Sequence, residues 1–114
     1  MEAQITNRKS GGVTVIDIAG RLGMSRSSGA VREAVRLALA EGDKKVLLNL
    51  TQVTHMDSSG IAELVSGYTM AVANQASLKL TGLNPRLASI LEITGLGRIL
   101  DVHADERSAI LSFG

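Results

Sequence analysis

The sequence KVLLNL at residues 45–50, followed closely by THMDSSGI at residues 54–61, decides the fold of this chain. The first segment is a short apolar run that is typical of a strand. The second leads into a helical pattern over Ser58 to about Asn74. The apolar stripe of that pattern consists of Ile61, Leu64, Val65, Tyr68 and Val72. A strand that passes directly into an amphipathic helix predicts an α/β fold.

The same alternation continues on both sides of this unit, with glycines and the single proline at the boundaries. In chain order we expect two strands between Gln4 and Ala19 with a turn at Ser10–Gly12, a helix over 25–40, a strand over 46–50, the helix over 58–74, a strand over 78–81, a helix from Asn84-Pro85 to Gly95, a strand over 99–102, and a last helix with Asp105 and Glu106 in its first turn. Ser27 or Ser28 is expected to cap the first helix, and Asn84 the third.

This order predicts a mixed, mainly parallel sheet with an N-terminal hairpin, because strands joined by helices run parallel through right-handed crossovers. If each strand adds beside the previous one, the helices all lie on one face of the sheet. The pairs Leu47/Asn49 and Lys79/Thr81 look mixed or polar, so we expect the other face to meet water.

The composition excludes several classes of function. The chain has 114 residues, 45% of them hydrophobic, and a net charge of +1, which argues against electrostatic binding of nucleic acid or an anionic membrane. It has no cysteine for disulfides or thiolate metal sites. Tyr68 and Phe113 are its only aromatic residues, too few for a base-stacking platform.

The length fits one domain over residues 1–114. No apolar run approaches the roughly 18 residues of a membrane span, and the start MEAQITNRKS has no signal-peptide core. We therefore expect a cytoplasmic protein without direct membrane contact.

Ser58 is the residue whose position best suits regulation. It lies where a strand ends and a helix begins, and the carboxyl ends of parallel strands are where functional groups gather. The unpaired N–H groups of a helix N-terminus favour an anion, so a phosphate on this serine would be tolerated there. The alternative is that Asp57, Ser58 and Gly60 only cap the helix, and the two interpretations are compatible.

The segment His55–Ile61, after Lys45–Leu50, resembles the signature of the STAS domain, and in particular that of bacterial anti-sigma factor antagonists. The resemblance covers nearly the whole chain. It also includes Ile16–Leu22 with its Gly-Arg-Leu, the strand at Leu78–Leu83, and the helix from Asn84-Pro85 to Thr94-Gly95-Leu96.

The resemblance implies a single STAS-like domain with about four helices on one face of its sheet. It also implies a protein that is not an enzyme and needs no cofactor or metal. Such an antagonist binds an anti-sigma factor that is also a serine kinase, and so releases a sigma factor. The kinase would phosphorylate Ser58, a metal-dependent serine phosphatase would reverse this, and the phosphate would abolish binding.

The resemblance assigns further roles around Ser58. Asp57 shapes the loop, Ser59 is a weaker phosphate acceptor, and Gly60 lets the partner approach closely. The loop from Gly20 to Ser25 forms the neighbouring docking surface. Its partner-binding residues would be Arg21, Gly23, Met24 and Ser25. The protein is expected to be a monomer or a weak dimer.

Two positions depart from the family. Members often carry an acidic residue where Asn49 stands, and an acidic or polar residue where Gly23-Met24 stands. Both departures would remove negative charge near the expected docking surface.

A hydrolase is the first alternative, with Ser58, Asp57, His55 and His103 as its residues, but no Gly-x-Ser-x-Gly elbow surrounds Ser58. A metal site at His55 and Asp57 has no recurrent ligand spacing, and nucleotide-binding motifs are absent. The more serious alternative is a STAS module without a phosphate switch, either a scaffold in a stress-signalling assembly or a cytosolic part of a transport system.

Two surface patterns remain open. Five basic residues suggest a basic patch or a solvated face: Arg8, Lys9, Arg26, Arg32 and Arg36. Small residues on the second helix form a stripe that either packs within the domain or offers a platform to a partner: Ala62, Ser66, Thr69 and Ala73.

Overall fold

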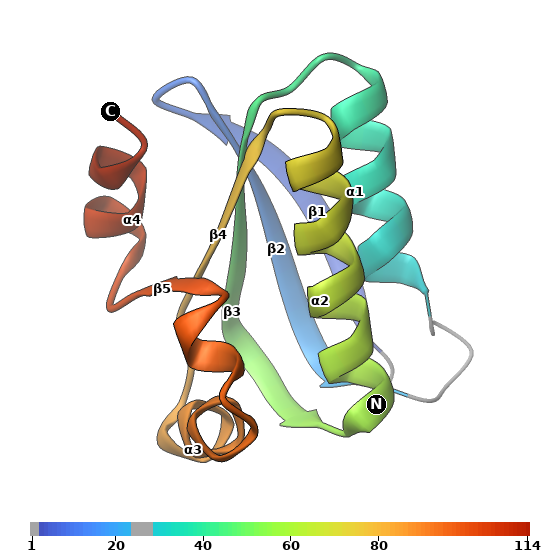
Figure 1. The fold of residues 1–114 in the computed structure, drawn as a ribbon, viewed down its shortest axis with the longest axis vertical. Coiled ribbons are helices and arrows are strands. Elements are labelled where there is room, and N and C mark those ends of the chain that lie inside the picture. The colour runs from blue at the N-terminus through green and yellow to red at the C-terminus, as the bar shows by residue number, and fades with distance from the viewer. Residues whose placement is uncertain (1–2, 24–28) are drawn as a thin grey trace.

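The computed structural model describes residues 3–23 and 29–114, and its described residues form one five-stranded sheet. The strand order is β1–β2–β3–β4–β5; β1 is antiparallel to β2, and every other neighbouring pair is parallel (Figure 1). The strands are β1 (Gln4–Ser10), β2 (Val13–Leu22), β3 (Lys45–Met56), β4 (Ser77–Thr81) and β5 (Asp101–His103). The α/β class, the N-terminal hairpin and the parallel crossovers are confirmed.

Four α-helices and one 3₁₀ turn connect and follow these strands. They are α1 (Ala30–Ala40), α2 (Ser58–Ala73), α3 (Pro85–Thr94), the 3₁₀ turn η1 (Leu96–Arg98) and α4 (Glu106–Ser112). The cap predicted for α3 is confirmed, because the Asn84 side chain accepts a hydrogen bond of 2.9 Å from the Leu87 N–H. Asp105 is the N-cap of α4 rather than part of its first turn. Ser27 and Ser28 lie outside the described residues. The residue at the N-cap position of α1 is Gly29, which is described.

The helices do not all lie on one face, which corrects the prediction. Helices α1, α2 and α3 pack against the larger core, whereas α4 covers the opposite face. Figure 1 shows α4 and the α1–α2 pair on opposite sides of the sheet. The residues beneath α4 are Val13, Val15 and Leu47, which Ala109, Ile110 and Phe113 cover. The prediction failed because Leu47 was grouped with Asn49 as a mixed face, although the neighbouring Val13 and Val15 make that end of the face apolar.

The stripe predicted for α2 is confirmed in part, because Leu64 is buried and Ile61 and Tyr68 pack against the core. Val72 is 56% exposed instead, and the other buried residues of the helix are Gly60, Glu63, Gly67 and Ala71. Small residues face inward because α1 lies very close. A β-carbon placed on Gly67 would stand 3.3 Å from Cγ2 of Val35. Periodicity in the sequence predicts that the large apolar side chains are buried. Where two helices pack closely, however, the side chains between them have to be small.

None of the helices in the described part of the chain has the length and apolar character that a membrane span needs.

Arg8, on the edge strand β1, connects that strand to β2 and to α4, on the face of the sheet that α4 covers. Its Nε donates to Oδ2 of Asp17 over 2.6 Å, and its other nitrogens donate to both carboxylate oxygens of Glu106 on α4. Asn49 donates to the second oxygen of Asp17 over 2.9 Å. Asn49 therefore belongs to this face and not to the docking surface, and an acidic residue at 49 would face Asp17 with like charge.

Acid should lower the free energy of unfolding by protonating Asp17, the carboxylate that Arg8 binds. The hydrogen bonds from Arg8 hold the pKa of Asp17 below its ordinary value of 3.8, against the opposing effect of partial burial. Because the folded state binds this proton less tightly than the unfolded chain, the stabilisation is complete above about pH 5 and is lost as the pH falls through the folded-state pKa. We expect Arg8→Met to reduce the difference in urea midpoint between pH 7 and pH 3. An unchanged difference would mean that other carboxylates, such as Asp43 beside Lys9, account for the acid sensitivity.

Candidate functional site

The site is the junction of β3 and α2, where Asp57 is the N-cap of the helix. Its Oδ1 accepts hydrogen bonds from the N–H groups of Ser59 over 2.8 Å and of Gly60 over 3.1 Å. Its own N–H donates to the carbonyl oxygen of Leu22 at the end of β2 over 3.2 Å. Asp57 thus fixes the first turn of α2 and holds it against the neighbouring strand.

Ser58 is the first residue of α2 and is exposed. Its hydroxyl makes no hydrogen bond to any described residue. Ser59, the next residue, is half-buried. The junction therefore presents one accessible hydroxyl at a helix N-terminus, the environment that favours an anion. The capping interpretation holds for Asp57, and Ser58 remains available for modification.

The two glycines of the site are needed for internal packing. A β-carbon on Gly60 would overlap the Leu22 carbonyl oxygen and stand 2.8 Å from Cγ of Met56. A β-carbon on Gly23 would overlap the Asp57 carboxylate. The close approach predicted for Gly60 is therefore an approach of β2, and a contact of Gly60 with a partner stays a prediction.

The docking loop predicted over Gly20–Ser25 is strand as far as Leu22. Arg21 pairs in register with His55, and both side chains are exposed beside the junction. Met24 and Ser25 lie outside the described residues. Strand β3 likewise continues to Met56, well beyond the predicted end at Leu50, and this extension carries the junction to the same edge as the end of β2.

The hydrolase residues do not assemble. His103 belongs to a separate cluster around β5, where its Nε2 lies 2.9 Å from Oδ1 of Asp101 and 3.3 Å from the hydroxyl of Ser112. His55 contacts the hydroxyl of its neighbour Thr54 over 3.1 Å. Within the described ranges, no group of three or more His, Cys, Asp and Glu side chains is arranged to hold a metal ion.

Glu63 is a residue of this region that the sequence analysis did not identify. It comes from α2, is only 7% exposed, and its Oε1 accepts a hydrogen bond of 3.0 Å from the Val31 N–H at the start of α1. Gly29 provides no side-chain cap there, so Glu63 supplies the cap from the neighbouring helix. No local pattern in the sequence indicates this role, because the Val31 N–H that it caps lies 32 positions earlier in the chain.

A small cavity of about 220 Å³ lies between the start of α1 and the first turns of α2, next to the junction. It is lined by Gly29, Arg32, Ser59, Ala62, Glu63 and Ser66. Two members of the small-residue stripe, Ala62 and Ser66, thus border a surface hollow. Thr69 and Ala73 are exposed. Whether the stripe serves packing or a partner therefore stays a prediction.

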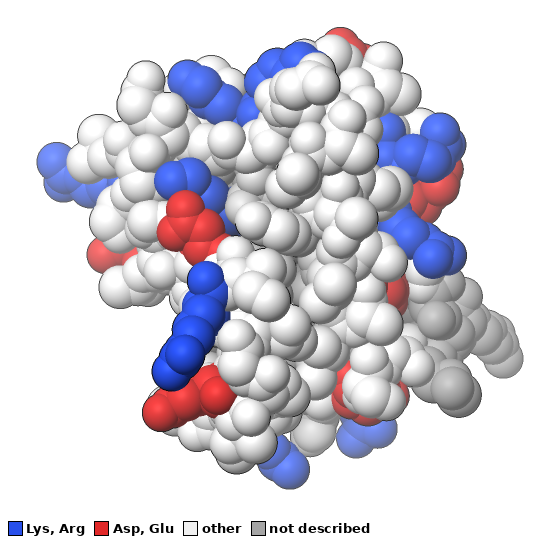
Figure 2. Space-filling model, in the orientation of Figure 1, with Lys and Arg blue, Asp and Glu red and all other residues white. Residues whose placement is uncertain are grey.

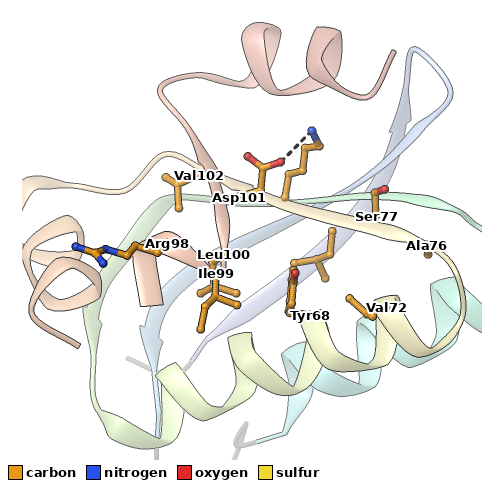
Figure 3. Close-up of a pocket in the computed structure, with 12 residues that line it drawn as sticks. Tyr68, Val72, Ala76, Ser77, Arg98, Ile99, Leu100, Asp101 and Val102 are labelled. Atoms are coloured by element: carbon orange, nitrogen blue, oxygen red, sulfur yellow. Dashed lines mark ion pairs between the residues drawn. The ribbon is translucent and has the colours of Figure 1, made fainter. Parts of the chain in front are cut away.

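A larger groove of about 610 Å³ lies at the other end of α2, away from Ser58. Figure 3 shows Tyr68 and Val72 rising from α2 toward Ile99 and Leu100, with the ion pair of Asp101 on the far side of the groove. None of the residues that line it belongs to the junction.

The suggested basic patch is not seen among those of its side chains that the structure describes, since most of these pair with acidic residues. Arg8 pairs with Asp17 and Glu106, Lys9 with Asp43, and Arg36 with Glu33. Figure 2 shows Lys and Arg scattered over the visible face among acidic side chains. Arg26 lies outside the described residues, and for the others the solvated-face interpretation holds.

Removing the cap should destabilise the domain modestly. For Asp57→Ala we expect the free energy of unfolding to fall by about 1 kcal/mol, because two N–H groups of α2 lose their acceptor. Asp57→Asn should lose only a small part of this, since Asn is also a good N-cap. Thermal unfolding measures both variants, and equal losses would show that the carboxylate charge, rather than the capping bonds, stabilises the junction.

Comparisons with known proteins agree with this geometry. The STAS domain family matches residues 4–109. The chain is 33% identical over 95 residues to the anti-sigma-B factor antagonist of Bacillus subtilis, covering 83% of this chain and 85% of that protein. Among solved structures, an anti-sigma factor antagonist from Mycobacterium paratuberculosis has a TM-score of 0.86 at 17% identity, covering 97% and 93% of the two chains. The Bacillus cell fate determinant SpoIIAA in its phosphorylated form has a TM-score of 0.73 at 20% identity, covering 97% and 100%.

Proposed function

The chain belongs to the STAS domain family, and from this premise we propose that it is an anti-sigma factor antagonist controlled by phosphorylation of Ser58. The single observation that carries the proposal is the exposed Ser58 hydroxyl at the N-terminus of α2, which has no hydrogen bond to a described residue and lies in a turn fixed by Asp57. In its unmodified form the protein binds a kinase-like anti-sigma factor and so releases a sigma factor. It acts by binding and not by catalysis.

Phosphorylation of Ser58 switches binding off without unfolding the domain. A phosphoserine carries roughly 1.5–2 negative charges, and the positive end of the α2 dipole favours charge of this sign. The Bacillus protein SpoIIAA has this fold in its phosphorylated form, which supports the expectation that the fold tolerates the group. The added charge lies on the docking surface and acts on the partner.

The docking surface combines the junction with the end of β2. Asp57 and Ser59 flank Ser58 in the chain, Gly23 lies against the Asp57 carboxylate, and Arg21 pairs in register with His55. Met24 and Ser25 continue the surface from the sequence prediction. A metal-dependent serine phosphatase would restore the unmodified form. These partners, the cytoplasm as the compartment, a monomer or weak dimer, and residues 1–114 as one domain remain part of the proposal.

The test is incubation with ATP and the cognate kinase-like anti-sigma factor, followed by mass spectrometry of intact protein and peptides. We expect one phosphate on Ser58 and none on the Ser58→Ala variant. Absence of phosphate together with absence of binding by the unmodified protein would reject the proposal. It would favour a scaffold or a transport-system module without a switch.

A further inference from the structure

The two adjacent serines of the junction face different electrostatic environments, although both lie in the first turn of α2. Ser58 is exposed, whereas Ser59 is half-buried and lines the 220 Å³ cavity together with Glu63. Ser59 and Glu63 stand at positions i and i+4 of the helix, so their β-carbons lie about 5–6 Å apart on the same face. Ser58 does not line this cavity.

The carboxylate of Glu63 is poorly screened. The side chain is 7% exposed, and while Oε1 caps α1 through Val31, Oε2 is buried without a hydrogen-bond partner among the described residues. A charge held away from water acts on its neighbours more strongly than a solvated one. A phosphate on Ser59 would share the cavity with this carboxylate.

We propose that Glu63 directs phosphorylation to Ser58 by making Ser59 an unfavourable position for a phosphate. This inference rests on the proposed function. In either transfer the serine Oγ forms a bond to the γ-phosphorus of ATP, the bond to the departing ADP breaks, and the hydroxyl proton is released. The bonds formed and broken are the same at both serines, so the electrostatic surroundings of each hydroxyl, which act on the phosphoryl group as it arrives and once it is attached, distinguish the two positions.

Two other charged groups adjoin Ser59. Asp57 accepts the Ser59 N–H but lies equally beside Ser58, so it does not distinguish the two positions. Arg32 lines the same cavity and would attract a phosphate, but it is exposed and therefore screened by water. Because Glu63 is buried and Arg32 is not, we expect the repulsion to exceed the attraction.

The experiment uses the full chain with phosphoserine inserted during translation at position 58 or at position 59, each with Glu63 and with Glu63→Gln. Glutamine keeps the size of the side chain and the oxygen that caps Val31, while it removes the charge. Glu92→Gln, on the exposed face of α3, is the matched control. The readouts are the thermal midpoint and a ³¹P NMR titration of the phosphate.

We expect phosphoserine at 59 to lower the midpoint by roughly 5–10 °C, and phosphoserine at 58 to change it little. The second pKa of the phosphate at 59 should lie about one unit above the usual value of about 6. Glu63→Gln should restore both quantities at 59 and leave those at 58 unchanged. Glu92→Gln should restore neither.

Equal midpoints for the two phosphoproteins, or no rescue by Glu63→Gln, would overturn the inference. A higher midpoint with phosphoserine at 59 would also overturn it, because it would mean that Arg32 dominates. None of these measurements needs a kinase or a partner, so their outcome is separate from that of the proposed function.

Discussion

Replacing Gly60 by alanine is expected to lower the free energy of unfolding by about 3 kcal/mol, or the thermal midpoint by roughly 12–18 °C. The new methyl group would overlap the Leu22 carbonyl oxygen, which the β2–β3 ladder holds in place, and would press on Met56. Alanine's better helix propensity returns only about 1 kcal/mol. Because the overlap is with backbone, α2 has to move away from β2, and this also displaces Ser58.

Gly97→Ala is the matched control. Gly97 lies in η1, where the nearest atom to an added β-carbon is 3.8 Å away and the backbone does not require glycine. We expect its thermal midpoint to stay within about 3 °C of the wild type. If Gly60→Ala were as stable as Gly97→Ala, the close contact between β2 and the first turn of α2 would not exist in solution.

Introducing a negative charge at Ser58 is expected to weaken binding to the anti-sigma factor about a hundredfold. One charge about 6 Å from a partner carboxylate, at an effective dielectric constant near 20, costs roughly 2.8 kcal/mol. Ser58→Asp should show this loss, and Ser58→Ala should bind like the wild type and resist phosphorylation. Isothermal titration calorimetry with the purified anti-sigma factor measures all three affinities.

Ser89→Asp provides the control for charge alone, since Ser89 is exposed on α3, outside the docking surface. Its affinity should match that of the wild type. If Ser58→Asp and Ser58→Ala both bound like the wild type, Ser58 would not be the switch, and a scaffold would be the better account of the protein.

Local signals in the sequence predicted most of the elements and the junction. Asn84-Pro85 and Gly95 delimited α3 because caps act within one turn of the helix that they end. Ser58 was placed at the start of α2 for the same reason. The ends of β2 and β3 were missed, because Gly20 and the polar residues Thr51 and Gln52 interrupt the apolar pattern while ladder pairing continues to Leu22 and Met56.

The role of Glu63 was beyond the reach of sequence patterns. An acidic residue in a helix is normally placed on the solvent side, and the helix that Glu63 caps begins 33 residues earlier, at Ala30. Only the packing of α1 on α2 brings its Oε1 to Val31. The same packing separates Ser59, beside Glu63, from the exposed Ser58.

The order of strands and helices, the parallel topology and the serine at the junction were predictable from the chain alone, because they follow from periodicity and caps over a few residues. Packing in three dimensions settles which face α4 covers, how far small residues share the buried side of α2 and which charges surround each serine. These features depend on the shapes of surfaces brought together from distant parts of the chain. In α2 the close approach of α1 favoured glycine and alanine over the larger apolar side chains that periodicity selects.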